Sequence, residues 1–240
     1  MAGHSKWANI KHRKGRQDEK RQKVFSKLIR ELTVAAKLGG AEPGDNPRLR
    51  LALDKALGAN MPKDTIERAI ARGSGDQEAE NLEETIYEGY GPNGVAIILE
   101  VITDNKNRSV AELRHIFTKF GGSLGETGSV SWMFEKKGQI ILESKSIVYE
   151  TLFDIVLIAG AENLEKFENS YIITTPFESL MEVKKTIEDH GYLTKSADYQ
   201  MISKTTQKVA KSESDSVMKL LDTLDNNDDV NRIFSNLDLD

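Results

Sequence analysis

The sequence contains no cysteine, which excludes disulfide bonds, thiolate metal sites and cysteine nucleophiles. It has no run of roughly eighteen apolar residues, so we expect no membrane-spanning helix. The start of the chain lacks an apolar stretch followed by a small-residue cleavage site, which argues against a secretory signal. These absences predict a cytoplasmic protein that does not interact with membranes.

Residues suited to catalysis or metal binding are present but not arranged in a recognisable pattern. The four histidines are scattered along the chain, and no spacing assigns the carboxylates Glu88, Glu100, Asp104 and Glu126 to acid, base or nucleophile roles. The glycine-rich turns lack the residues that accompany a phosphate-binding loop. We therefore predict no enzymatic activity, no catalytic residues, no cofactor and no metal site.

Two charged segments leave a choice between binding and simple solvation. Lys106 and Arg108 stand beside a helix start, where they either hold a phosphate or lie in a solvated loop. The helix itself is expected to open with a capping box formed by Ser109 and Glu112. Acidic residues near the C-terminus are spaced irregularly, which favours solvated charge over a cation site. They are Asp222, Asp225, Asp228, Asp229, Asp238 and Asp240.

Charge of the two signs is separated along the chain. Residues 1–72 hold 17 Lys and Arg against 8 Asp and Glu, a net charge of +9, whereas the remaining residues hold 16 against 30, a net charge of −14. A basic end on an acidic body indicates a polyanionic partner for that end, because the body repels nucleic acid. The alternative is a solvated basic tail without a dedicated partner.

The first 22 residues offer little to bury, so we expect a basic arm that is poorly ordered alone and orders on contact. Its cations would bind a phosphate backbone by releasing counterions. Trp7 either stacks on an unpaired base or RNA loop, or folds back over an apolar groove. The candidate binding residues of the arm are Lys6, Trp7, Lys11, Arg13, Lys14, Arg16, Lys20 and Arg21.

Residues 23–75 have the pattern of three short helices. From Gln22 to the glycine pair at 39–40, apolar residues from Val24 and Phe25 to Ala36 recur on one face. Lys23, Lys27 and Arg30 fall on the opposite face and are predicted to extend the binding surface of the arm. Two further helices begin near Pro47 and Pro62. Their cations can enlarge the positive surface: Arg48, Arg50, Lys55, Lys63, Arg68 and Arg72.

Residues 76–84 form an acidic stretch that reads as a linker, and the hydrophobic period changes from 3.6 to 2 after it. This change predicts a strand hairpin closed by the turn at residues 91–94. Residues 138–201 follow a strand–helix–strand–strand–helix–strand order, the ferredoxin-like plan. The fold class is therefore α+β and multidomain. We predict a basic arm at residues 1–22, a helical domain at 23–75, a discontinuous α+β domain at 80–137 and 202–240, and an inserted ferredoxin-like domain at 138–201.

Several blocks, among them MAGHSKWANIKHRKGRQDEKRQKVFSKLIREL, YEGYGPNGVAIILEVITDNKNR and FGGSLGETGSVSWMFEKKG, resemble the YebC family. This family comprises probable transcriptional regulators and is related to mitochondrial translational activators. The resemblance implies a helical N-terminal domain and two α+β domains, the third inserted in the second.

Three functional hypotheses follow. The first, which the resemblance implies, is a DNA-binding regulator of transcription. The second is a ribosome- or RNA-associated translation factor that uses the same basic surface on ribosomal or messenger RNA. The third is an assembly module in which the ferredoxin-like domain pairs with protein partners, which exposed apolar patches would support. The sequence leaves the oligomeric state open and favours a monomer.

Overall fold

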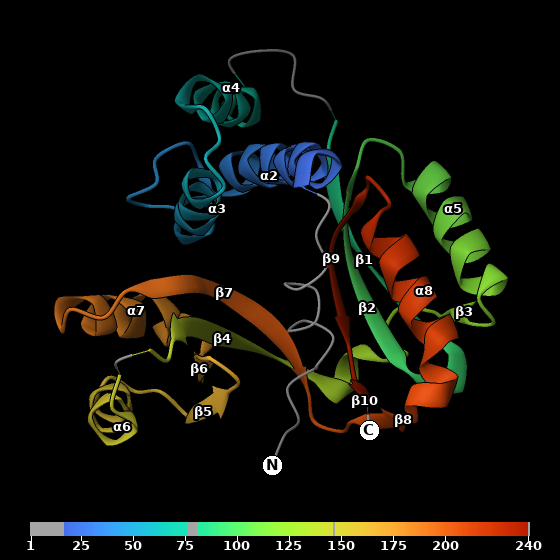
Figure 1. Cartoon of the computed structure of the whole chain (residues 1–240). Coiled ribbons are helices and arrows are strands. Elements are labelled where there is room, and N and C mark those ends of the chain that lie inside the picture. Colours follow the sequence, from blue (N-terminus) through green and yellow to red (C-terminus); the bar gives the residue numbers. More distant parts are fainter. Residues whose placement is uncertain (1–16, 76–80, 146, 240) are drawn as a thin grey trace. The chain divides into compact units, whose positions relative to one another are not determined.

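The computed structural model describes residues 17–75, 81–145 and 147–239, with side chains from residue 22 onward. Phe134–Ile202 form one compact unit, and the described residues before and after them form the other. Figure 1 shows the elements of both units. The chain is α+β with a helical N-terminal region and antiparallel sheets, which confirms the predicted fold class.

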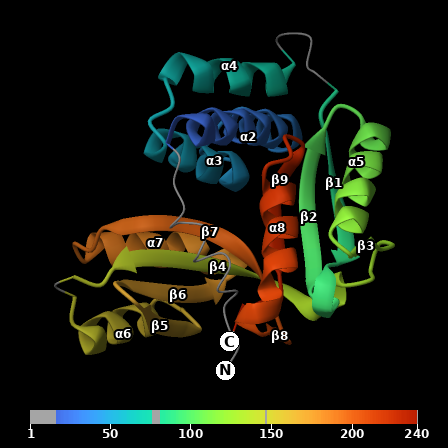
Figure 2. The same ribbon diagram turned by 45° about the vertical axis from the view of Figure 1, so that its right-hand side comes forward.

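The N-terminal region is a bundle of three helices (Figure 2). They are α2 (Gln17–Gly39), α3 (Pro47–Gly58) and α4 (Lys63–Ser74). Leu32, Leu49 and Ile66, one from each helix, meet in its core. Asn46 caps α3 by accepting a hydrogen bond from Leu49 N at 3.0 Å, and its amide donates to Ala35 O at 2.8 Å. This buried side chain therefore starts one helix and attaches it to another.

Helix α2 differs from the sequence prediction in two respects. It begins at Gln17 and not near Gln22, so Lys20 and Arg21 belong to its first turns and not to the arm. The residues from Gln17 to Lys20 are all polar, so hydrophobic periodicity could not mark this start. Val24 was expected on the buried face but is exposed, whereas Val34 is buried against Leu82 and the sheet residue Ile102. Helix α2 is thus covered on two sides.

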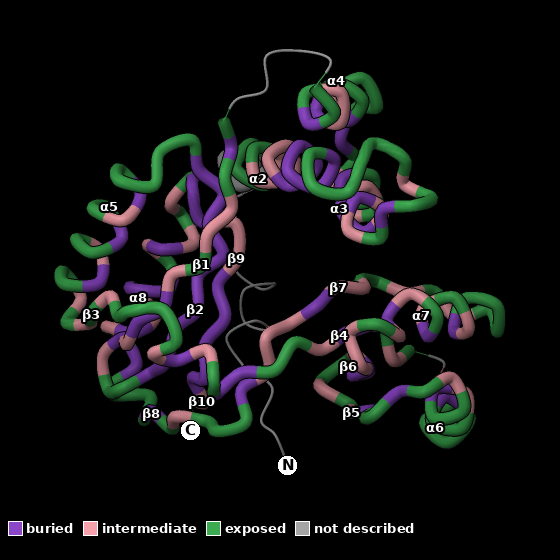
Figure 3. Tube along the Cα trace, turned by 180° about the vertical axis from the view of Figure 1, so that it is seen from behind, coloured by how far each residue is buried: buried purple, intermediate pink, exposed green. Residues whose placement is uncertain are grey.

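A four-stranded antiparallel sheet follows in the same unit, in the order β3-β1-β2-β9. Its elements are β1 (Glu83–Tyr90), β2 (Ala96–Thr103), β3 (Ser123–Leu124) and β9 (Val230–Ser235), with helices α5 (Lys106–Lys119) and α8 (Ser214–Asp225). Phe117 of α5 and Leu220 of α8 pack with Ile97 and Leu99 of β2. Strand β2 is buried along its whole length, as Figure 3 shows. A short parallel pair, β8 (Gln207–Val209) and β10 (Leu237–Leu239), completes the unit.

The expected capping box of α5 is wrong. The helix starts at Lys106, and its cap is Asn105, whose side chain accepts a hydrogen bond from Arg108 N at 3.0 Å. Ser109 lies inside the first turn and is buried. The prediction failed because Asn105 offers the same capping chemistry one turn earlier, and Ser109 has a different partner.

The second unit contains two helices and a four-stranded sheet in the order β5-β6-β4-β7. Its elements are β4 (Phe134–Glu143), α6 (Tyr149–Ile158), β5 (Asn163–Phe167), β6 (Ser170–Pro176), α7 (Leu180–Asp189) and β7 (Thr194–Ser203). Leu152 of α6 and Val183 of α7 pack on Ile140 and Ile173 of the sheet. This element order and strand order are those of a ferredoxin-like fold.

Candidate nucleic-acid interface

The cations predicted on α2 contact an acidic loop that lies about 200 residues further along the chain. Lys23 Nζ donates to the carbonyl of Asn226 at 3.1 Å. Lys27 Nζ donates to the carbonyl of Asp225 at 2.8 Å and pairs with its carboxylate at 3.2 Å. The loop comprises residues 225–229, from the last residue of α8 to the start of β9, and we call it the acidic loop. The face of α2 that carries Lys23 and Lys27 is therefore an intramolecular contact surface.

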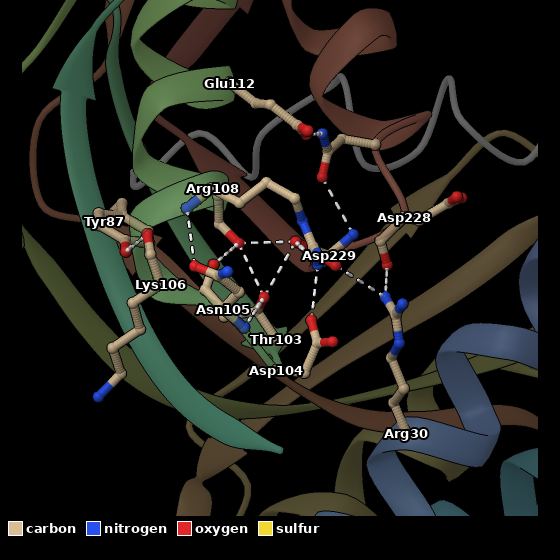
Figure 4. A network of polar contacts seen from close by, with 12 residues as sticks. Arg30, Tyr87, Thr103, Asp104, Asn105, Lys106, Arg108, Glu112, Asp228 and Asp229 are labelled. Atoms are coloured by element: carbon tan, nitrogen blue, oxygen red, sulfur yellow. Dashed lines mark hydrogen bonds and ion pairs between the residues drawn. The ribbon is translucent and has the colours of Figure 1, made fainter. Parts of the chain in front are cut away.

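Arg30 lies one turn further along the same face of α2. Its guanidinium donates to the carbonyl of Asp228 and lies 3.4 Å from the carboxylate of Asp229 (Figure 4). All three cations thus contact residues of the acidic loop. The 4- and 3-residue spacing places them on one helix face, so they meet the loop together.

Asp229 is the buried centre of the acidic loop. Its carboxylate accepts hydrogen bonds from Ser109 Oγ at 2.6 Å and Thr103 Oγ1 at 3.0 Å, and Arg108 approaches it at 3.4 Å. The carbonyl of Asp229 accepts from Ile102 N at 2.9 Å. These donors provide the hydrogen bonds that a buried carboxylate requires.

These contacts correct the sequence interpretation of the C-terminal acidic residues. The Asp225 carboxylate pairs with Lys27 and Asp229 is 6% exposed, so neither is simply solvated charge. Asp228 is exposed and contacts α2 through its backbone carbonyl. The sequence signal that was missed is the position of Asp229 directly before a buried strand, where a side chain at the strand end can reach the neighbouring helix start.

Arg108 of α5 also contacts the acidic loop, through the carboxylate of Asp229. It pairs with Asp104 at 2.6 Å, and this contact raises the pKa of Arg108 and lowers the pKa of Asp104. Next to it lies a polar hollow of about 350 Å³, lined by Arg30, Arg108, Glu112 and residues 226–229. Because the lining mixes both signs of charge, the hollow is not a simple anion site.

Comparisons with known proteins agree with this architecture. The family description "TACO1/YebC protein N-terminal domain" matches residues 5–76, and "TACO1/YebC second and third domain" matches residues 82–237. The chain belongs to the TACO1/YebC family. A "probable transcriptional regulatory protein" of Geotalea uraniireducens is 50% identical over 239 residues, and one of Pseudomonas paraeruginosa is 52% identical over 240 residues. Each match covers 100% of this chain and 96% of the relative.

A solved structure is similar over nearly the whole chain. It is the crystal structure of a conserved hypothetical protein from Aquifex aeolicus, which is 44% identical in sequence. The match has a TM-score of 0.89 and covers 98% of both chains. This TACO1/YebC protein therefore shares its fold with that solved structure.

The remaining predicted binding residues are distributed differently. Lys6, Trp7, Lys11, Arg13, Lys14 and Arg16 lie outside the described residues, and for Lys20 and Arg21 the structure describes only the helical backbone. Among the further cations of the bundle, Lys63, Arg68 and Arg72 are exposed on α4. Arg48 instead pairs with Glu31 at 2.9 Å and Glu84 at 2.8 Å, so it does not contribute to an open positive surface.

In the ranges 17–75, 81–145 and 147–239, no group of three or more His, Asp or Glu could hold a metal ion. None of the helices in these ranges is long and apolar enough to cross a bilayer.

A double-mutant cycle tests the contact between α2 and the acidic loop. Lys27 and Asp225 are mostly buried by their surroundings, with side chains 18% and 26% exposed. We expect Lys27→Gln combined with Asp225→Asn to reveal a coupling of about 1 kcal/mol in urea unfolding, because partial burial limits screening. The control pair is Lys219 and Asp215, which are 3.8 Å apart with side chains 67% and 89% exposed. Equal coupling in both pairs would contradict a stabilising contact between Lys27 of α2 and Asp225 of the acidic loop.

Proposed function

We propose that this TACO1/YebC protein is a non-enzymatic, nucleic-acid-binding regulator of gene expression that acts in the cytoplasm. The observation that carries the proposal is the separation of charge, with +9 on residues 1–72 and −14 on the rest. Such a chain presents one basic end to a polyphosphate while its body repels the same partner. The relatives' name, probable transcriptional regulatory protein, supports DNA as the partner.

The structure divides the cations of this end into two groups. The cations at positions 23, 27 and 30 of α2 donate hydrogen bonds to the acidic loop. Lys63, Arg68 and Arg72 of α4 are exposed. Nucleic acid could reach the first group only by displacing the loop. We therefore assign first contact to the basic residues before position 22 and to α4. Lys23, Lys27 and Arg30 remain predicted binding residues that require this exchange.

Neutralising the arm tests the proposal. We expect the variant with Gln at positions 6, 11, 13, 14 and 16 to bind nucleic acid at least tenfold more weakly at moderate salt. The slope of log K against log salt should become shallower by up to about 4.5 for duplex DNA, because up to five phosphate contacts are lost. Fluorescence anisotropy over a salt series measures both quantities.

The matched control replaces five exposed lysines of the acidic body with Gln: Lys145, Lys185, Lys195, Lys204 and Lys211. It should bind no more weakly than the parent, since the charge removed lies outside the proposed surface. If both variants lose affinity equally, the basic end has no special role and the proposal fails.

The same assay separates transcription from translation. A regulator of transcription should prefer its promoter duplex to random duplex by about 10³ or more at physiological salt. A translation factor should instead prefer structured RNA and sediment with ribosomes in a manner that the arm variant loses. The second outcome is favoured by Trp7, because an indole in a basic arm can stack on an unpaired base.

A further inference from the structure

Helix α6 in the ferredoxin-like unit carries apolar side chains on two sides. Leu152 and Val156 point into the core of the unit. Tyr149, Phe153 and Leu157 recur every four residues and form a second row with exposed fractions of 38%, 39% and 56%. We call this row the α6 stripe. A surface helix usually has polar residues outside the face that packs on the core. The α6 stripe is therefore apolar surface that the unit itself does not cover.

The α6 stripe is held in a fixed arrangement. The rings of Tyr149 and Phe153 stack with centroids 6.0 Å apart, and Tyr149 also lies 5.9 Å from the ring of Tyr171. The Tyr149 hydroxyl donates to Leu164 O on β5 at 3.3 Å. A partner would therefore meet ordered side chains and would lose less entropy on binding.

Acidic residues border the α6 stripe. Glu150 and Asp154 follow Tyr149 and Phe153 by one residue each, which places them along one edge of the row at 100° per residue, and both are exposed. Residues 134–202 as a whole contain seven lysines, no arginine and twelve Asp and Glu, a net charge of −5. This charge disfavours nucleic acid at the stripe and favours a basic partner.

The dimensions of α6 suit a short segment better than a second copy of the chain. A ten-residue helix is about 15 Å long. A stable dimer usually buries roughly 800 Å² on each partner, more than one row of side chains supplies. Two copies packed through α6 would also bring their Glu150 and Asp154 carboxylates together.

We propose that α6 is the docking surface for a basic amphipathic helix of a partner protein. The apolar side chains of that helix pack on Tyr149, Phe153 and Leu157, and its Lys or Arg side chains pair with Glu150 and Asp154. The inference goes beyond nucleic-acid binding and does not depend on it, because it concerns a unit with the opposite charge.

A pair of synthetic helical peptides tests the proposal with the full-length chain. The probe has Leu at positions i, i+3, i+4 and i+7 with Lys elsewhere, and its counterpart keeps the Leu pattern but has Glu in place of Lys. We expect the basic peptide to bind at least tenfold more tightly in fluorescence anisotropy. Equal binding of the two peptides would overturn the proposal.

Variants locate the binding to α6. Phe153→Ser with Leu157→Ser should lower the affinity for the basic peptide about tenfold or more, whereas Leu193→Ser, which changes an exposed leucine elsewhere in the unit, should not. Glu150→Gln with Asp154→Asn should weaken binding severalfold and reduce its salt dependence. The control, Glu178→Gln with Glu182→Gln, removes two exposed carboxylates outside α6. If the paired variants and controls behave alike, the proposal is wrong.

Two other occupants give distinct results that would also overturn it. A dimer in sedimentation equilibrium that disappears with Phe153→Ser and Leu157→Ser would identify a second copy as the occupant. A large rise in peptide affinity on deleting residues 1–16 would identify the chain's own basic arm. Failure of the nucleic-acid assay would leave the peptide result unaffected, so the two proposals are tested separately.

Discussion

Replacing Arg48 by methionine is expected to lower the free energy of unfolding by about 3–5 kcal/mol, because it leaves a buried carboxylate without its partner. Arg48 of α3 pairs with Glu31 of α2 and Glu84 of β1. Glu31 is 4% exposed and also accepts a hydrogen bond from Asn231 Nδ2 at 2.7 Å. The triad therefore joins the helical bundle to the sheet. Urea unfolding at pH 7 measures the loss.

The double variant Arg48→Met with Glu31→Met is the control. It removes both buried charges, so it should be considerably more stable than the single Arg48→Met variant. If the two variants are equally unstable, the cost comes from the lost packing of the Arg48 side chain and not from the stranded charge.

The same triad predicts a dependence of stability on pH. Burial alone would raise the pKa of Glu31, but hydrogen bonds and charge from Arg48, with further charge from Arg232 and Lys55, lower it below its ordinary value. A carboxyl with a lowered pKa in the folded state stabilises the fold above its unfolded pKa, about 4.3, and this stability is lost as pH falls through the folded value. In the Arg48→Met variant this contribution should shrink, because the hydrogen bonds and the charge of Arg48 no longer lower the pKa of Glu31.

Replacing Glu88 by alanine is the second change with a large expected effect, about 3 kcal/mol of unfolding free energy. The Glu88 carboxylate is 4% exposed and accepts hydrogen bonds from the backbone N–H groups of Gly128, Val130 and Ser131 at 2.7–2.8 Å. Alanine would leave these donors without an acceptor, at a cost of about 1–3 kcal/mol for each one that water does not reach. Thermal unfolding with near-ultraviolet circular dichroism measures both stability and the order of the loop.

Glu126→Ala is the matched control, because Glu126 is an exposed carboxylate in the same loop. It should change stability by less than about 0.5 kcal/mol. Similar losses in the two variants would show that Glu88 does not hold the loop.

Glu88 also contributes to acid sensitivity. Burial raises the pKa of this carboxyl. Hydrogen bonds from the three backbone donors and the Ser131 side chain together lower the pKa by more than burial raises it, so the net shift is downward. Its contribution to stability is therefore present at neutral pH and lost when pH falls through the folded pKa. The pH profile of Glu88→Ala should be flatter than that of the parent in the acid range.

Local patterns predicted most elements of the fold. Pro47 preceded by Asn46 marked the start of α3, and the turn at residues 91–94 marked the β1–β2 hairpin. The order of strands and helices expected in residues 138–201 indicated the ferredoxin-like plan, and the strand order of the second unit is that of this plan. The start of α2 was missed because its first turn has no apolar residue. The cap of α5 was misplaced because Asn105 and Ser109 both satisfy the capping preference.

The candidate site was predicted less completely. The spacing of Lys23, Lys27 and Arg30 correctly placed them on one face of α2, but it did not indicate what lies opposite that face. Arg48 had the same local signature as an exposed helix cation, yet it is the centre of the triad. In both cases the missing information is the position of a carboxylate that is distant in sequence.

The amino-acid sequence alone determined the separation of charge and the α+β class, because composition and periodicity are properties of short segments. The family followed from the resemblance of whole sequence blocks to known members. Only the tertiary structure decided which cations are occupied by the acidic loop and which remain exposed, and it alone revealed the α6 stripe. The reason is physical: a charge or an apolar side chain acts on whatever group lies within a few ångströms, and chain folding brings residue 27 to residue 225 without any local signal.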